Sequence, residues 1–227
     1  MIAAVLTGDI VASSKMSPDT LAQVRQTVLG VRGALEDWHE GAVIGAPEFF
    51  RGDSWQLILA RPGLLLRACL LVRGRLKGAR LGDTRIAVGV GEVTAVDEER
   101  VSLSTGEAFE LSGRALDAMK GERMALTMAP AFGAVGDFAS ATLRLCDAMF
   151  AGWTARQAEI AAVALEAGAD TYGEIARRLG DGLSEQAVGK AVRSIGLDAV
   201  SDPLAAFEDE RWLKTKGREK QPKKVVI

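Results

Sequence analysis

Two aspartates, Asp9 and Asp53, each follow a glycine at a point where an expected strand ends. An apolar run over residues 2–6 leads into the first Gly-Asp pair, and expected strands over 49–52 and 55–60 flank the second as a hairpin. If the first strand and the hairpin are neighbours, both carboxylates project from one edge of the sheet. Close carboxylates repel, and Mg²⁺ or Mn²⁺ relieves this by taking one or two of them with water and phosphate oxygens. The pair therefore predicts a divalent-cation site, with two ordinary turns as the alternative because Gly and Asp are common turn residues.

Two further features near this pair suit a phosphate-bearing ligand. Ser13 and Ser14 lie just beyond Asp9, where hydroxyls and backbone N–H groups could receive a phosphate. An expected strand over 84–93 has large apolar residues on one face, whereas Gly89 and Gly91 lie on the other face. A strand face of small residues usually means that something large approaches the backbone.

The elements that must position these residues follow a β-α-β-β-α-β order, with a further helix and strand after it. Expected helices begin at Ser17-Pro18-Asp19 and at Pro62, and others cover 107–120 and 137–150, with a strand over 123–129. This order predicts an α+β fold of the ferredoxin-like type, a sheet backed by helices on one face. The Gly152-Trp153 junction is the expected end of this first domain, residues 1–152.

Residues 153–208 predict a small all-α domain. Thr154 with Gln157, and Thr171 with Glu174, fit the capping box, and helices are expected over 154–166, 171–179 and 184–195. The last two resemble the helix-turn-helix of bacterial regulators, with Asp181-Gly182 as an insertion in the turn. The residues expected to face outward and meet DNA bases and phosphates are Ser184, Gln186, Gly189, Lys190 and Arg193. The alternative is a helical bundle for protein contacts.

Composition narrows the class of protein. A net charge of −2 argues against coating nucleic acid by bulk electrostatics, although residues 209–227 form a basic tail that we expect to be disordered. Cys69 and Cys146 lie inside apolar helical patterns and are expected to be core residues in a reducing compartment. Arg67 and Arg73 interrupt the longest apolar runs, so no membrane span is expected. The start of the chain lacks the basic region of a signal peptide, and we expect a cytoplasmic protein.

Four segments, 7–14, 50–53, 85–93 and 106–116, occur in the order seen in class III nucleotidyl cyclases, a resemblance that covers most of residues 1 to 130. The opening Thr-Gly-Asp-Ile and the appended helices look still more like the SatD family of small bacterial proteins. This resemblance implies that Asp9, the Ile10 carbonyl and Asp53 hold the metal ions. The nucleotide contacts that we expect are at Ser13, Ser14, Gly52, Gly89, Gly91 and Arg114. A homodimer is implied too, because cyclase sites usually form across a dimer.

The sequence also departs from the cyclase pattern. If Arg114 matches the arginine that stabilises the transition state, the position of the accompanying Asn holds Glu110, and the purine-reading Lys falls at Phe49. Loss of one such donor typically costs about 3 kcal/mol of transition-state stabilisation. The leading hypothesis is a SatD-like regulator with a metal–nucleotide-binding palm coupled to a DNA-binding helix-turn-helix. The alternatives are an active cyclase or nucleotidyl transferase using two metals, and a non-catalytic interaction scaffold.

Overall fold

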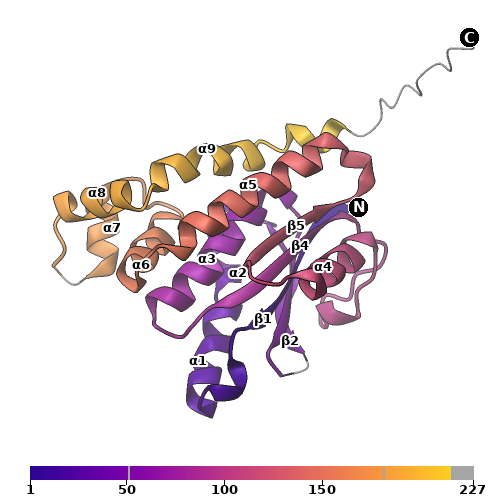
Figure 1. Cartoon of the computed structure of the whole chain (residues 1–227), viewed down its shortest axis with the longest axis horizontal. Helices are drawn as coiled ribbons and strands as arrows, with labels where there is room; N and C mark the ends of the chain where they lie inside the picture. Colours follow the sequence, from indigo (N-terminus) through magenta and orange to yellow (C-terminus); the bar gives the residue numbers. More distant parts are fainter. Residues whose placement is uncertain (51, 181, 216–227) are drawn as a thin grey trace, which may run out of the picture.

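The computed structural model describes residues 1–50, 52–180 and 182–215 and contains a five-stranded sheet in the order β2-β3-β1-β4-β5 (Figure 1). The strands are β1 (Ile2–Ile10), β2 (Val43–Phe50), β3 (Ser54–Leu59), β4 (Thr84–Glu92) and β5 (Met124–Met128). Strand β1 is central and antiparallel to both β3 and β4, whereas β5 is parallel to β4. The α+β class and the arrangement of the first four strands agree with the ferredoxin-like expectation.

Nine α-helices accompany the sheet in the described residues. They are α1 (Pro18–Leu29), α2 (Val31–Trp38), α3 (Leu65–Gly78), α4 (Glu107–Ala118), α5 (Ala134–Ala151), α6 (Ala155–Ala164), α7 (Tyr172–Leu179), α8 (Glu185–Ser194) and α9 (Leu197–Glu208). Local signals set several helix starts, because the Ser17, Thr154, Thr171 and Ser184 side chains each accept a hydrogen bond from the backbone N–H three residues later.

Helices cover both faces of the sheet, so the expectation of helices on one face was wrong. Val88 and Val90 of β4 belong to the main core, which they share with α1, α2, α3 and α5. The alternate residues Ala87, Gly89 and Gly91 point the other way, towards α4. Strand residues alternate between faces, so the large side chains and the small ones select different layers.

Helix α4 occupies the small-residue face of β4, where we expected nucleotide contacts. A Cβ atom built on Gly89 would lie 2.1 Å from the Ala108 carbonyl oxygen, and one on Gly91 would lie 3.0 Å from the Glu107 carboxylate. Both glycines are buried. The close approach that their small size indicates is therefore that of a helix of this chain, which corrects the assignment of Gly89 and Gly91 to a ligand.

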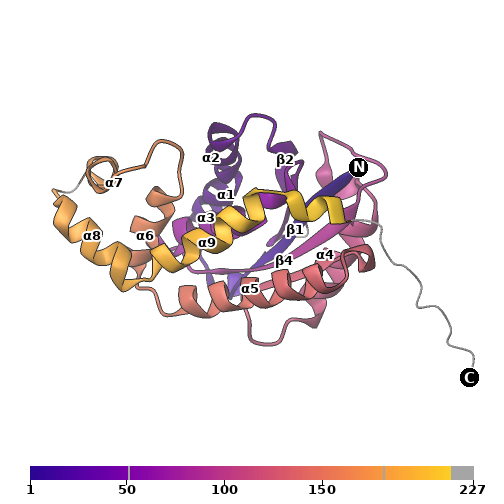
Figure 2. The ribbon, with the colours of Figure 1, turned by 90° about the horizontal axis from the view of Figure 1, so that it is seen from above.

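The C-terminal helices share one hydrophobic core with the sheet-containing part. Helix α9 runs along the body of the molecule, with α6, α7 and α8 towards one end (Figure 2). Arg67 of α3, which interrupts an apolar run in the sequence, is buried and donates to the Glu208 carboxylate of α9 at 2.7 Å and to the Leu165 carbonyl at 2.7 Å. The division at residues 152 and 153 stays a prediction, because the core continues across it.

The described end of the chain is more ordered than we expected. Residues Arg211–Thr215 form a 3-10 helix, and the Trp212 ring packs 5.9 Å from that of Phe132. Glu210 accepts a hydrogen bond from the Gly63 N–H at 2.9 Å. The rest of the expected basic tail, residues 216–227, lies outside the described residues. In the described ranges, no helix combines the length and apolar character that crossing a bilayer needs.

Candidate functional site

The end of β1 and the β2–β3 turn bring Asp9 and Asp53 to the same edge of the sheet. Asp9 pairs in register with Ser54, the residue after Asp53. The Ile10 N–H donates to the Asp53 carbonyl oxygen at 3.2 Å, which ties the turn to the end of β1. The sequence places the two aspartates 44 residues apart, and the antiparallel pairing of β1 with β3 makes them neighbours.

Arg85 of β4 neutralises Asp9. The two residues face each other in the β1–β4 register, and the guanidinium grips both carboxylate oxygens, with Nε donating to Oδ1 at 2.8 Å. This hydrogen bonding with Asp9 raises the pKa of Arg85, and the charges of Asp117 and Asp53 act in the same direction. The Arg85 side chain is 33% exposed and that of Asp9 is 21% exposed, so the pair lies at the surface of the site, within reach of solvent and solutes.

Asp53 has a different partner. Ser13 donates its hydroxyl hydrogen to Oδ2 of Asp53. The chain can turn back to do so because Ala12 adopts the left-handed conformation, with φ of 56°, directly before the 3-10 helix Ser13–Lys15. Arg25 of α1 secures the other side of the turn by donating to the Gly52 carbonyl oxygen at 2.7 Å. Gly52 is exposed and has a φ of 85°, a conformation that glycine adopts readily. Ser14 is exposed as well.

A buried tryptophan supports the backbone beneath Asp9. Trp55 is fully buried, and its indole N–H donates to the Thr84 hydroxyl at 3.0 Å, which in turn donates to the Asp9 carbonyl oxygen at 2.6 Å. Gly8 makes room for this ring, since a Cβ there would lie 2.5 Å from the indole. The glycine before Asp9 therefore has a packing role, and the chain around the carboxylate is held rigidly.

The oxygen atoms of this site are of the type that binds a hard divalent cation, but both carboxylates already have hydrogen-bond partners. Mg²⁺ and Mn²⁺ sites commonly use one or two carboxylates, with water or phosphate oxygens completing the shell, and Asp9, Asp53 and the Ile10 carbonyl are oxygen donors at one edge. In the described part of the chain, no group of three or more His, Cys, Asp or Glu side chains is arranged to hold a metal. A cation at Asp9 would have to replace Arg85, which now supplies the compensating charge.

Arg114 lies on the exposed side of α4. Its side chain is 70% exposed and pairs at 3.9 Å with Glu110, which is 72% exposed. The carboxylate of Glu110 therefore lies beside the guanidinium of Arg114, one turn earlier on the same exposed face of α4.

Three charged residues that the structure brings to this site, Arg25, Arg85 and Asp117, had no role in the sequence-based predictions. Arg85 lies within one of the four segments that carry the cyclase resemblance. Residues two apart in a strand share a face, so Arg85 lies on the face of Ala87, and the β1–β4 register puts Asp9 on that face too. The alternation along β4 was therefore the sequence signal that could have identified Arg85. The position of Asp117 depends on where α4 packs, and no local pattern gives that.

Four of the five residues that we expected to contact DNA are exposed, and one is buried. Ser184, Gln186, Lys190 and Arg193 are exposed on or next to α8, and the Ser184 hydroxyl caps the helix by accepting from the Ala187 N–H at 3.2 Å. Gly189 is buried, and a Cβ there would lie 2.9 Å from the ring of Tyr172 in α7. Gly189 is therefore a helix-packing residue, which corrects its assignment to the outward face. Asp181, in the expected insertion, lies outside the described residues.

Comparison with solved structures finds similarity to nucleotidyl cyclase folds. The guanylyl cyclase Cya2 is 19% identical, with 56% of this chain and 75% of that chain covered and a TM-score of 0.38. A bacterial light-regulated adenylyl cyclase is 17% identical, with 56% and 43% covered and a TM-score of 0.44. A class III adenylyl cyclase-like ATP-binding protein from Pseudomonas aeruginosa is 12% identical, with 94% and 44% covered and a TM-score of 0.38.

This chain spans less than half the length of the second and third of these proteins. No protein-family model and no curated protein matches the sequence. At these identities and TM-scores the likeness is one of chain path and says nothing of activity. Membership of the SatD family and the helix-turn-helix stay predictions.

Proposed function

We propose that the Asp9–Asp53 edge binds a divalent cation together with the phosphate groups of a nucleotide. The observation that carries this proposal is the convergence of β1 and the β2–β3 turn, which brings two carboxylates and the Ser13 hydroxyl to one half-exposed place. Three carboxylates, those of Asp9, Asp53 and Asp117, act on the single guanidinium of Arg85. A site with excess negative charge favours a cation.

In this proposal Asp9 and Asp53 hold the metal, and Arg85 is the residue that gives way. A bound divalent cation would supply charge neutralisation for phosphate oxygens. Once released from Asp9, the Arg85 guanidinium has the geometry to donate two parallel hydrogen bonds to phosphate oxygens. Ser13 and Ser14 lie at the turn next to the metal-binding carboxylates, where they would contact the same phosphates.

We propose nucleotide binding rather than efficient cyclisation. Glu110 stands where the resemblance calls for an Asn, and it adds negative charge on the helix that carries Arg114. A carboxylate near a triphosphate is unfavourable electrostatically. The catalytic alternative makes a different prediction, namely turnover of a nucleoside triphosphate in the presence of Mn²⁺.

A thermal-shift experiment with product analysis tests the proposal. Mn²⁺ with each nucleoside triphosphate is added to the full chain, and ligand at about 100 times its Kd should stabilise the fold by about 2.7 kcal/mol, which raises Tm by a few degrees. Asp9→Asn and Asp53→Asn should abolish the rise, whereas Asp37→Asn, an exposed aspartate of α2, should not. Chromatography of the mixture identifies any product. A Tm that no nucleotide moves would overturn the proposal and favour the scaffold alternative.

A second candidate function, DNA binding through α8, is favoured by one observation. Gln186, Lys190 and Arg193 are exposed at spacings of four and three, which places them on one face of the helix. Only two of them are cationic, so we propose weak binding with a shallow salt dependence. Fluorescence anisotropy with duplex DNA from the chain's own promoter region should show lower affinity for Lys190→Ala with Arg193→Ala. An unchanged affinity of this variant for the duplex would refute the assignment of α8 as the DNA-contacting helix.

A further inference from the structure

Helix α5 presents an apolar stripe to solvent. Ala134, Phe138, Ala141, Leu145 and Ala148 recur at steps of four and three along it. Phe138 is 76% exposed and Leu145 is 68% exposed, the two highest values among the exposed large hydrophobic residues of the described chain. Figure 2 shows α5 along an outer side of the molecule. Two large apolar side chains one heptad apart, on one line of a helix, favour a partner surface.

The other side of α5 already has its partners, so the stripe is additional to the core. Leu143, Cys146 and Phe150 of the helix are buried in the main hydrophobic core. The stripe repeats every 3.5 residues on average, which is the period of helices that pack side by side over several turns.

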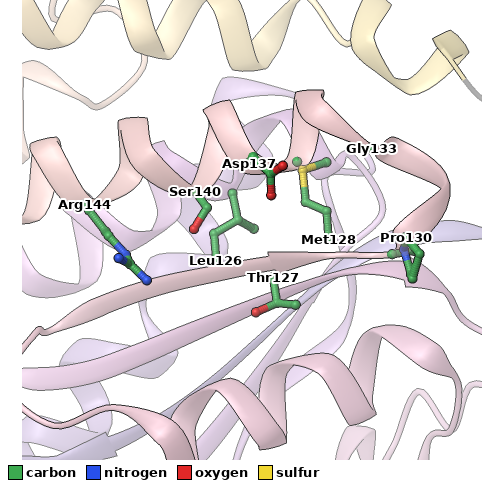
Figure 3. Close-up of a pocket in the computed structure, with 10 residues that line it drawn as sticks. Leu126, Thr127, Met128, Pro130, Gly133, Asp137, Ser140 and Arg144 are labelled. Atoms are coloured by element: carbon green, nitrogen blue, oxygen red, sulfur yellow. The ribbon is translucent and has the colours of Figure 1, made fainter.

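A polar flank runs along one side of the stripe. Asp137, Ser140 and Arg144 line a cavity of about 420 Å³ between α5 and the edge strand β5 (Figure 3). Asp137 and Arg144 carry opposite charges and lie one heptad apart. Within the residues that the structure describes, neither side chain makes an ion pair.

We propose that α5 is a self-association surface on which two copies of this chain pack stripe against stripe, antiparallel, about a two-fold axis at Ala141. In this arrangement Ala134 meets Ala148 of the second copy, and Phe138 meets Leu145. Asp137 of each copy comes beside Arg144 of the other. A parallel pair would instead place the two flanks on opposite sides of the seam, where Asp137 cannot meet Arg144. The stripe and its flank are therefore self-complementary in one orientation, as an isologous interface requires.

The size of the surface sets the expected affinity. An 18-residue helix is about 27 Å long, so a pair of such helices forms an interface near the lower end of the specific class. We expect a dimer that dissociates in the micromolar range. This self-association goes beyond the nucleotide proposal and does not depend on it, because none of the stripe residues lies at Asp9 or Asp53.

Sedimentation of the full chain over a range of concentrations tests the proposal. The wild-type chain should be in monomer–dimer equilibrium, and Phe138→Asp and Leu145→Asp should each raise the dissociation constant at least tenfold. Leu103→Asp is the matched control, since Leu103 is 54% exposed and lies outside α5. A wild-type chain that stays monomeric at every concentration would overturn the proposal, as would a dimer that both α5 variants leave intact.

Two further variants fix the orientation. Asp137→Arg and Arg144→Asp should each weaken the dimer, and their combination should restore it, because the exchanged charges again face each other. In the proposed geometry Ala141 meets its own copy, so Ala141→Cys should be cross-linked by a short bis-maleimide whereas Ala134→Cys should not. The native Cys69 and Cys146 are buried. Cross-linking at position 134 with none at 141 would exclude the antiparallel pair.

Discussion

Two arginines of this protein pair with aspartates in opposite surroundings. Arg73 of α3 is 1% exposed and grips Asp83 at 2.7 Å and Asp147 at 2.6 Å. Arg85 of β4 is 33% exposed and grips Asp9 alone, with further carboxylates within electrostatic reach. The first cluster places its guanidinium inside the core between two carboxylates, whereas the second lies at an open edge of the sheet.

The two clusters differ in burial, and burial decides how costly it is to separate the charges. The Arg73 guanidinium also lies 4.1 Å from the Phe150 ring centre, and Asp147 accepts from the Arg123 N–H at 2.8 Å, so that cluster joins α3, α5 and the start of β5. Breaking such a cluster leaves charges without partners in a medium of low dielectric constant. The Arg85 pair can exchange its partner for solvent or a ligand at small cost. We therefore assign the first cluster to stability and the second to binding.

The largest effect should come from Arg73→Met. Removing the guanidinium leaves the Asp147 carboxylate buried and unpaired, so we expect the free energy of unfolding to fall by about 3–5 kcal/mol. Urea denaturation followed by circular dichroism measures it. The matched control is Arg75→Met, two residues along α3, whose pair with Glu166 is about one quarter exposed. That variant should lose less than about 1 kcal/mol. Equal losses would show that burial does not distinguish the two pairs.

A second test concerns how dry the interior beside Arg73 is. Burial raises the pKa of the Cys69 thiol from 9.0 to about 12, with smaller contributions from charged neighbours that include Arg73 and Asp147. As the pH rises above 9.0, the unfolded chain loses this proton and the folded chain keeps it. The stability tied to Cys69 is therefore complete below pH 9.0 and falls by about 1.4 kcal/mol per pH unit between there and about pH 12.

Urea denaturation at pH 9 and about pH 10 measures this slope, and Cys69→Ala supplies the control because it lacks the thiol. The wild-type chain should lose about 1 kcal/mol more than the variant over that interval, because the unfolded thiol is already half ionised at pH 9. Identical slopes would mean that the thiol ionises freely in the folded state and that water reaches the cluster.

The sequence predicted features of the fold that depend on local patterns, but it did not predict the pairing of distant residues in these clusters. The caps at Thr154 and Ser184, the helical periodicities and the alternation along β4 are local, so they predicted most elements. The Gly-Asp pairs predicted that Asp9 and Asp53 lie at strand ends. Arg73, by contrast, interrupts an apolar run in the sequence, and only its pairing with Asp147, 74 residues away, explains its burial.

The errors share the same cause. Small residues at Gly89 and Gly91 correctly indicated a close approach, but the sequence could not say that α4 makes it. Gly189 looked like a surface position because its neighbours are polar, although Tyr172 packs on it. Which surface a small residue contacts depends on the packing of distant elements, and helix periodicity alone leaves that choice open.

The smallest effect on stability, and the sharpest on binding, should come from Arg85→Gln. The pair with Asp9 is partly exposed, so its loss should lower the free energy of unfolding by less than about 1 kcal/mol. The same change removes the positive charge that competes for Asp9, so Mn²⁺ should bind about five- to tenfold more tightly in calorimetric titration. Arg85→Lys keeps the charge and should leave the metal affinity nearer to that of the wild type. If Arg85→Gln instead unfolded the chain as Arg73→Met does, or left Mn²⁺ affinity unchanged, Arg85 would be a structural residue and the two clusters would not differ in kind.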